Sequence, residues 1–235
     1  MNEKNKKFIK ITGITAIILI ITGIILFWLL DLGSRLIRHP LNFQDMSKIK
    51  LEKPVNSVEE GYPYALKRAR EWREDVVLTE VEIISSAIGT IDEIDDIEDR
   101  NEIIRYTFEF EYMNEKQPSG FILVYLNVKT NCIDMVSAYH DDNNLFSPKD
   151  ELDPEAISDK IGKVYDAALK AIGKENILGS AGLYFSAKIN SNFAVVSVYR
   201  EIDNEEGNFE NYEITIDMST FEVTEMEIKE ARREE

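Results

Sequence analysis

The sequence contains few of the side chains that usually carry catalysis or bind metal ions. Its 235 residues include one cysteine, Cys132, and two histidines, His39 and His140. A single cysteine excludes an intramolecular disulfide, and two histidines so far apart in the chain do not indicate a His-rich metal site. No G-x-S-x-G segment is present. We therefore predict no catalytic, cofactor-binding or metal-binding residues, and no cofactor.

Cys132 and His140 have simpler interpretations. A lone cysteine among apolar neighbours is more often a small buried side chain than a nucleophile, and we expect this of Cys132. His140 precedes Asp141 and Asp142. It is expected to be an exposed turn residue, with weak cation binding as the alternative.

Positive side chains are also in the minority. The chain has 27 Lys and Arg against 44 Asp and Glu, a formal net charge of −17 at pH 7. Residues 1–39 hold six of the positive and two of the negative side chains, so residues 40–235 carry a net charge of −21. Nucleic-acid binding depends on Lys and Arg that neutralise phosphates, and this balance excludes it. Nucleotide binding is not predicted either. The acidic field favours basic partners or divalent cations, and simple solubility is the alternative.

The longest hydrophobic run lies at residues 11–30. Fifteen of its twenty residues are Ile, Leu, Ala, Phe or Trp, and none is charged. A helix of this length, at about 1.5 Å per residue, matches the roughly 30 Å hydrocarbon core of a bilayer. Four lysines within residues 1–10 predict that this end stays in the cytoplasm. We predict a cytoplasmic tail at 1–10, a single-pass transmembrane helix at 11–30 and an extracytoplasmic domain after it.

A cleaved export signal is the alternative for this segment. Such a signal usually has an apolar region of about 7–15 residues and a small-x-small cleavage site. The run at 11–30 is longer, and Asp31-Leu32-Gly33-Ser34 offers a poor cleavage site. An uncleaved anchor is therefore favoured.

Residues 31–56 are predicted to be a tether with little regular structure. Apolar residues at helical spacing then predict a helix from about Glu60 to about Arg73. Pro63 sets this start, because proline fits best in the first turn of a helix. Trp72 lies on the apolar stripe of this helix and is expected in the core rather than in a sugar or peptide groove.

Alternating or continuous apolar residues predict four strands after this helix. In one of them Tyr106, Phe108, Phe110 and Tyr112 alternate with polar residues, as in a strand with one buried face. A tight turn is expected at 129–131. The four strand ranges are 76–84, 104–112, 121–128 and 132–139.

A second helix is predicted to begin at Asp153-Pro154, with Asp as the N-cap and Pro at the first helical position. Gly173 is a plausible end for it. Four more strands are expected, and residues 204–208 resemble a hairpin loop. The strand ranges are 183–189, 193–202, 212–218 and 221–228.

The order of a helix followed by strands thus occurs twice. Tyr62-x-x-Ala65-Leu66-Lys67 in the first helix also reappears as Tyr165-x-x-Ala168-Leu169-Lys170 in the second. We predict an α+β fold class, in which one transmembrane helix precedes two tandem repeats of a helix packed on an antiparallel β-sheet. The domain boundaries are a first repeat at 57–140, a linker at 141–152, a second repeat at 153–229 and a charged tail at 230–235.

The helix Tyr64–Trp72, with its following strand, and the hairpins Asn127–Ile133 and Thr215–Phe221 resemble PepSY-like modules. The family hairpin commonly has an Asp before the turn and a Gly within it. Asp217 fits the first feature and Lys129 does not; neither turn has the Gly. Asn131 is expected to adopt a positive φ in glycine's place.

This resemblance implies a PepSY/cystatin-like fold and a non-enzymatic role. Such modules occur in propeptides of secreted peptidases and in membrane-anchored envelope proteins, with inhibition or regulation proposed for them. The resemblance transfers no functional residue to this chain.

An acidic run at 92–99 lies in the predicted loop 90–101. Clustered oxygens suit hard cations, but this run lacks the Gly and the spaced terminal Glu of an EF-hand loop. A solvated acidic loop is expected, and cation binding stays the alternative.

The function we predict is a membrane-anchored, extracytoplasmic binding or regulatory module without catalytic activity, which modulates an envelope protein or peptidase. Its expected partners are the membrane, through residues 11–30, and a protein or envelope component of basic character. One alternative is an envelope hydrolase with carboxylates of raised pKa in a cleft between the repeats. The other is a structural spacer.

Overall fold

The computed structural model describes residues 43–88, 101–114, 117–140, 150–177, 180, 182–203 and 208–232. The chain divides into two compact units, Met1–Leu41 and Asn42–Glu235, and every described residue belongs to the second. The predicted tail 1–10, the predicted span 11–30, His39 and the acidic run 92–99 therefore lie outside the described residues. Within the described part, no helix is both long enough and apolar enough to cross a membrane.

Ten strands, two α-helices and one 3₁₀ helix make up the described part of the chain. In chain order they are β1 (Phe43–Asp45), β2 (Ile49–Lys50), α2 (Val58–Arg70), β3 (Val76–Ile88), β4 (Asn101–Asn114), β5 (Gln117–Asn127), β6 (Cys132–His140), α4 (Pro154–Ile172), η1 (Lys174–Asn176), β7 (Gly182–Ile189), β8 (Phe193–Asp203), β9 (Asn208–Asp217) and β10 (Val223–Arg232).

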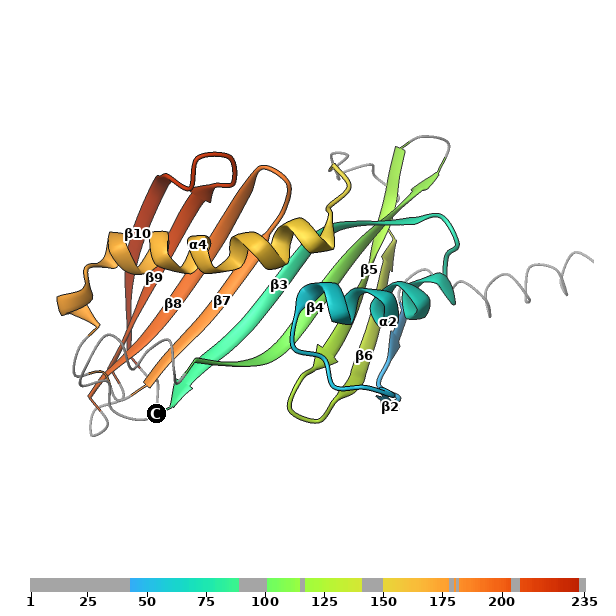
Figure 1. Ribbon diagram of the computed structural model, residues 1–235, viewed down its shortest axis with the longest axis horizontal. Coiled ribbons are helices and arrows are strands. Elements are labelled where there is room, and N and C mark those ends of the chain that lie inside the picture. Colours follow the sequence, from blue (N-terminus) through green and yellow to red (C-terminus); the bar gives the residue numbers. More distant parts are fainter. Residues whose placement is uncertain are drawn as a thin grey trace, which may run out of the picture. The chain divides into compact units, whose positions relative to one another are not determined.

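All ten strands belong to one antiparallel sheet. Their order is β1-β6-β5-β4-β3-β7-β8-β9-β10, and β2 pairs with β6 beside β1. Successive strands are neighbours from β3 to β6 and from β7 to β10. At the centre β3 pairs with β7 over eight residues, from Val81↔Ile189 to Ile88↔Gly182. This pairing joins the two halves of the sheet (Figure 1).

The predicted fold class is wrong. The described residues form a mostly-β structure with one continuous sheet and only two α-helices, not tandem helix-on-sheet repeats behind a transmembrane helix. The physical reason lies at β3 and β7, because two separate sheets would leave two long edges of unpaired backbone N–H and C=O groups. Pairing β3 with β7 lets the N–H and C=O groups of both edges form hydrogen bonds. The buried side chains of the two halves then belong to one hydrophobic cluster.

Both helices lie on the same face of the sheet (Figure 1). Helix α2 packs over β4, β5 and β6, and α4 packs over β8, β9 and β10. Strands β3 to β9 bury alternate side chains beneath them. In β4 these are Tyr106, Phe108, Phe110 and Tyr112, as the alternation predicted; in β7 they are Leu183, Phe185, Ala187 and Ile189.

Helix α4 has the ends predicted for it. Asp153 is the N-cap and its carboxylate accepts the N–H of Glu155, Pro154 is the first helical residue, and Gly173, at φ 85°, ends the helix. Helix α2 begins two residues earlier than predicted. Ser57 caps it by accepting the N–H of Glu60, so Pro63 lies beyond the first turn. The exposed position of Pro63 leaves its ring in solvent.

The predicted tether contains regular structure, contrary to expectation. Strands β1 and β2 both pair with β6, through Phe43↔Ala138 and Ile49↔Ile133 among others. Leu51 and Val55, which follow them, belong to the hydrophobic core. Residues 43–56 are therefore part of the folded unit.

Two hairpin turns share one geometry. In the turn after β5 the amide oxygen of Asn127 accepts the N–H of Thr130, and Asn131 has a φ of 52°, which confirms the positive φ predicted there. In the turn after β9 the Asp217 carboxylate accepts the N–H groups of Ser219 and Thr220, and Phe221 has a φ of 59°. The residue with positive φ therefore comes four positions after the Asn or Asp in both turns.

Candidate functional site

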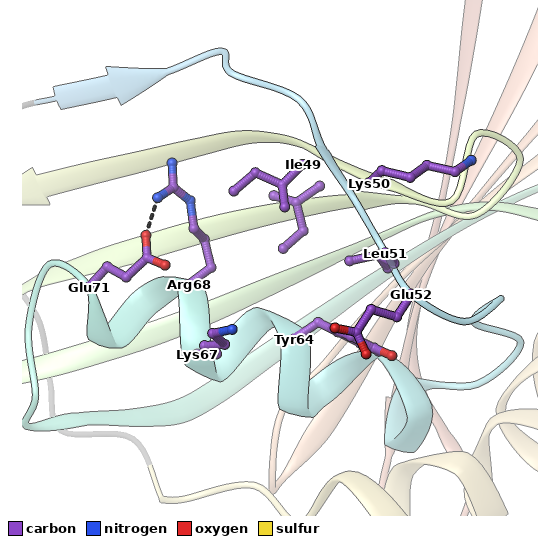
Figure 2. Close-up of a pocket in the computed structure, with 9 residues that line it drawn as sticks. Ile49, Lys50, Leu51, Glu52, Tyr64, Lys67, Arg68 and Glu71 are labelled. Atoms are coloured by element: carbon purple, nitrogen blue, oxygen red, sulfur yellow. Dashed lines mark hydrogen bonds and ion pairs between the residues drawn. The ribbon is translucent and has the colours of Figure 1, made fainter.

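A groove of about 200 Å³ separates helix α2 from the segment that carries β2. Figure 2 shows the segment Ile49–Glu52 running beside the helix, with Arg68 and Glu71 paired on the helix side. Lys50 and Lys67 add two further positive charges to this groove, in a unit whose net charge is negative. The lining residues are Ile49, Lys50, Leu51, Glu52, Tyr64, Lys67, Arg68, Glu71 and Ile133.

Arg68 connects helix α2 to strand β1 at this groove. Its guanidinium donates to the carboxylates of Glu71, in the same helix, and of Asp45, at the end of β1. The side chain of Arg68 is only 12% exposed. Because both of its carboxylate partners come from the protein itself, Arg68 serves here to fix β1 beside α2.

Ser47 and Arg68 together lower the pKa of Asp45. Hydrogen bonds from Ser47 and the positive charge of Arg68 hold the pKa of the Asp45 carboxyl below its usual value. A carboxyl group with a lowered folded-state pKa stabilises the fold above its unfolded pKa, and this contribution is lost as the pH falls through the folded value. Protonating Asp45 should therefore loosen β1 from α2 only at pH values below the ordinary Asp range.

We expect Ser47→Ala and Arg68→Gln each to raise the pKa of Asp45, because each removes a group that lowers it. Carboxyl chemical shifts followed by NMR during an acid titration would measure it. Lys67→Gln, on the same helix, is the matched control and should leave this pKa unchanged. An equal Asp45 pKa in Arg68→Gln and Lys67→Gln would contradict the role given to Arg68.

The other face of the sheet carries a second, larger candidate surface. Both described helices lie on the opposite face, so side chains that point away from the helices form what we call the open face. Its polar centre is Glu82 in β3, the strand that joins the two halves. Thr107 and Ser186 donate hydrogen bonds to the Glu82 carboxylate, at 3.2 and 3.0 Å. The Arg105 guanidinium lies 3.7 Å from it.

Aromatic side chains surround this centre in the first half of the sheet. The guanidinium of Arg105 lies 5.3 Å from the centroid of the Tyr125 ring, a cation–π distance. Between β5 and β6, the rings of Phe121 and Tyr139 stack with their centroids 4.8 Å apart. Tyr139 is 42% exposed.

A hollow of about 370 Å³ opens beside Arg105 and Tyr125. Met46 and Lys48, from the connection between β1 and β2, form one side of it. The ammonium of Lys48 lies 4.0 Å from the carboxylate of Asp134. The complete lining is Met46, Lys48, Ile84, Ile104, Arg105, Tyr125, Asn127, Asp134 and Met135.

Two more tyrosines lie on the open face of the second half. Tyr184 in β7 and Tyr199 in β8 are directly opposite each other in the register, and both are exposed, at 51% and 43%. Their neighbours along each strand, such as Phe185 and Val198, are buried beneath α4. The open face thus presents aromatic side chains on both sides of the Glu82 centre.

The residues singled out in the sequence are not gathered at either surface. Cys132 is half-exposed at the start of β6, where its thiol lies 3.3 Å from the carbonyl oxygen of Thr130. It is therefore not the fully buried side chain expected. His140 ends β6, and its side chain is outside the described part. Trp72 packs against the core, as predicted.

The pKa values of the Asp45 and Asp217 carboxyl groups are lowered, whereas the hydrolase alternative requires carboxylates of raised pKa. No group of three or more His, Cys, Asp or Glu in the described ranges is arranged to hold a metal ion. The residues of the open face, by contrast, were missed from sequence. The signal for them is the aromatic residue at outward positions of a strand, as at Tyr184 and Tyr199.

Comparison with known proteins adds little. No sequence profile of a known family matches the chain, and no curated protein matches it significantly. One solved structure, a Clostridium difficile protein described as a candidate lipoprotein, aligns with 72% of this chain and 92% of its own, at 11% identity and a TM-score of 0.39. A likeness this weak carries no argument, and the PepSY resemblance stays a prediction.

Proposed function

We propose that this chain is an extracytoplasmic binding or regulatory module, without catalytic activity, that engages a protein partner through the open face of its sheet. The observation that carries the proposal is the composition of that face. Tyr139, Tyr184 and Tyr199 are exposed, and Arg105 lies over Tyr125. Tyrosine, tryptophan and arginine are the residues enriched at the energetic centres of protein interfaces.

Location outside the cytoplasm is supported by the N-terminal sequence. A Lys-flanked apolar segment precedes the acidic unit, and either an anchor or an export signal of this kind directs the rest of the chain across the membrane. An acidic, non-catalytic unit with an aromatic surface suits a partner of basic character.

The test is recovery of a cross-linked partner from native envelopes by the tagged full-length chain and three variants. Tyr139→Ser alters the open face of the first half, and the double variant Tyr184→Ser/Tyr199→Ser alters that of the second. Lys67→Glu alters only the groove beside α2. We expect the open-face variants to lower recovery of one defined partner at least tenfold, since side chains at such centres each contribute about 2 kcal/mol or more.

Lys67→Glu is expected to keep that partner, because its side chain lies on the helix layer and not on the open face. Circular dichroism would establish that all variants fold. Loss of the partner with Lys67→Glu, together with full recovery by the tyrosine variants, would assign binding to the groove and contradict the proposal.

A further inference from the structure

The outer edge of the last strand pairs with no other described strand. Strand β10 spans ten residues, Val223–Arg232, and pairs only with β9 among the described strands. The opposite end of the sheet is closed by strands of three and two residues, β1 and β2. Natural sheets usually keep exposed edges short in this way, because a long edge offers a row of unpaired N–H and C=O groups to another strand.

Strand β10 also exposes apolar side chains on the helix side of the sheet. Met226 and Ile228 are opposite Ile214 and Tyr212 of β9 in the register. Those two partners are buried, at 0% and 5% exposure, whereas Met226 is 37% and Ile228 is 56% exposed. The hydrophobic layer beneath α4 therefore continues past β9 into β10, where its side chains are partly exposed among the described residues.

The charged residues of the segment Glu225–Lys229 lie on the open side. Glu225, Glu227 and Lys229 alternate with the two apolar residues, and the ammonium of Lys229 lies 3.1 Å from the Glu227 carboxylate. The pattern from Glu225 to Lys229 has an acid at one end, a base at the other, and Met226 and Ile228 at equal distances from the central Glu227.

This pattern is complementary to itself when it is reversed. A second β10, placed antiparallel with Glu227 opposite Glu227, sets Met226 against Ile228 of the other copy on the helix side. On the open side it sets Glu225 against Lys229 of the other copy. Each of these pairs occurs twice, because the axis that relates the copies is twofold. Directly opposed apolar and opposite-charge pairs are the ones that stabilise antiparallel strands.

We propose that the outer edge of β10 is a docking site for a second copy of this chain, in the antiparallel register centred on Glu227. The axis is perpendicular to the sheet, so both copies keep their helices on one side and their open faces on the other. The one like-charge pair in this register is Glu227 opposite Glu227 of the other copy. On each strand, Lys229 lies beside Glu227.

Disulfide trapping in the full-length chain tests the contact. With Cys132→Ser as background, Glu227→Cys should form a disulfide-linked dimer on mild oxidation, because opposed residues have Cα atoms about 4.5–5.5 Å apart, within reach of a disulfide. Glu213→Cys is the matched control. Glu213 is opposite Glu227 on the neighbouring strand and faces the same side, but two such cysteines would be about 15 Å apart.

Charge reversal tests the register and the occupant together. In the Glu227→Cys background, Glu225→Lys alone and Lys229→Glu alone should each lower the dimer yield about tenfold, because each creates two like-charge pairs. Mixing these two variants should restore it as a heterodimer, since each Lys then faces a Glu. Reducing and non-reducing gels measure the yield.

Three results would overturn the proposal. Cross-linking at position 227 no stronger than at 213 would show that the edges do not meet. Insensitivity to the charge reversals would exclude this register. A trapped product with a mass other than twice that of the chain would show that another protein occupies the edge. The Glu213 control also accounts for any association through residues 11–30, which would act equally on both positions.

Discussion

Replacing Phe108 by alanine is expected to lower the free energy of unfolding of the compact unit by about 3–5 kcal/mol, the usual cost of removing a buried phenylalanine ring. Phe108 is 0% exposed in the middle of β4. Its ring lies between those of Tyr106 and Phe110, with centroids 6.2 and 6.5 Å away. A Cβ on Gly61 of α2 would lie 3.0 Å from the tip of the ring, so the helix closely approaches the sheet here.

Urea unfolding of residues 42–235, followed by the fluorescence of Trp72, measures this change. Trp72 is the single tryptophan of that unit and packs against the same core. Phe193→Ala is the matched control, because Phe193 is 43% exposed in β8 and its loss should change stability by only about 0.5 kcal/mol. An equal effect of the two substitutions would show that the core is not organised around β4.

Because the sheet is continuous, we expect its two halves to unfold together. Phe185 is 1% exposed beneath α4 and packs edge-on against Tyr165 at 5.7 Å. Because β3 pairs with β7 and the core is one cluster, Phe185→Ala should shift the transition reported by Trp72 in the other half. A Trp72 transition unmoved by Phe185→Ala would mean that the two halves unfold separately.

The local elements of this fold follow from local chemistry, and sequence patterns predicted them for that reason. The side-chain period of two places Phe108 and Phe110 on one face of a strand whatever its neighbours are. Asp153, Pro154 and Gly173 fix the ends of α4 through one cap, one missing N–H and one positive φ. Asn131 tolerates a positive φ because its short polar side chain permits it.

The arrangement of the sheet could not be obtained in this way. Strand β3 alternates apolar and polar residues in the same manner whether it lies at an edge or between two strands, so nothing local reveals its pairing with β7. Separate repeats were predicted because a helix followed by strands occurs twice in the chain and the same short motif recurs in both helices. Strands β1 and β2 were missed for a related reason, since strands of three and two residues have too few positions to show a period.

The open face was missed because outward positions of a strand are normally solvated. Glu82, Thr107 and Ser186 come from three strands and form a hydrogen-bonded group only through the β4-β3-β7 order. The proposed contact through β10 would matter for this surface, because a twofold axis perpendicular to the sheet turns both open faces to the same side. A partner that presents two copies of its binding site would then gain avidity from the pair.

Replacing Gly120 by alanine is expected to cost about 2–4 kcal/mol, because the substitution combines overpacking with the loss of a hydrogen bond. Gly120 lies in β5 with a φ of +156°, and a Cβ there would lie 2.0 Å from the carbonyl oxygen of Tyr139. It would also lie 2.3 Å from the Tyr112 hydroxyl, which donates a 2.9 Å hydrogen bond to that same carbonyl. A glycine within a strand commonly marks such a close approach.

Gly162→Ala is the same substitution at a position where the structure predicts a gain in stability instead of a loss. Gly162 lies in α4 with nothing within 4 Å of the added Cβ, so alanine should stabilise the helix by about 0.5–1 kcal/mol.

Tyr112→Phe removes the hydroxyl that the alanine of Gly120→Ala would contact too closely. The double variant should therefore lose less stability than the two single changes added together. Urea unfolding of the four variants measures both comparisons. Strict additivity, or destabilisation by Gly162→Ala, would contradict this account of why β5 contains a glycine.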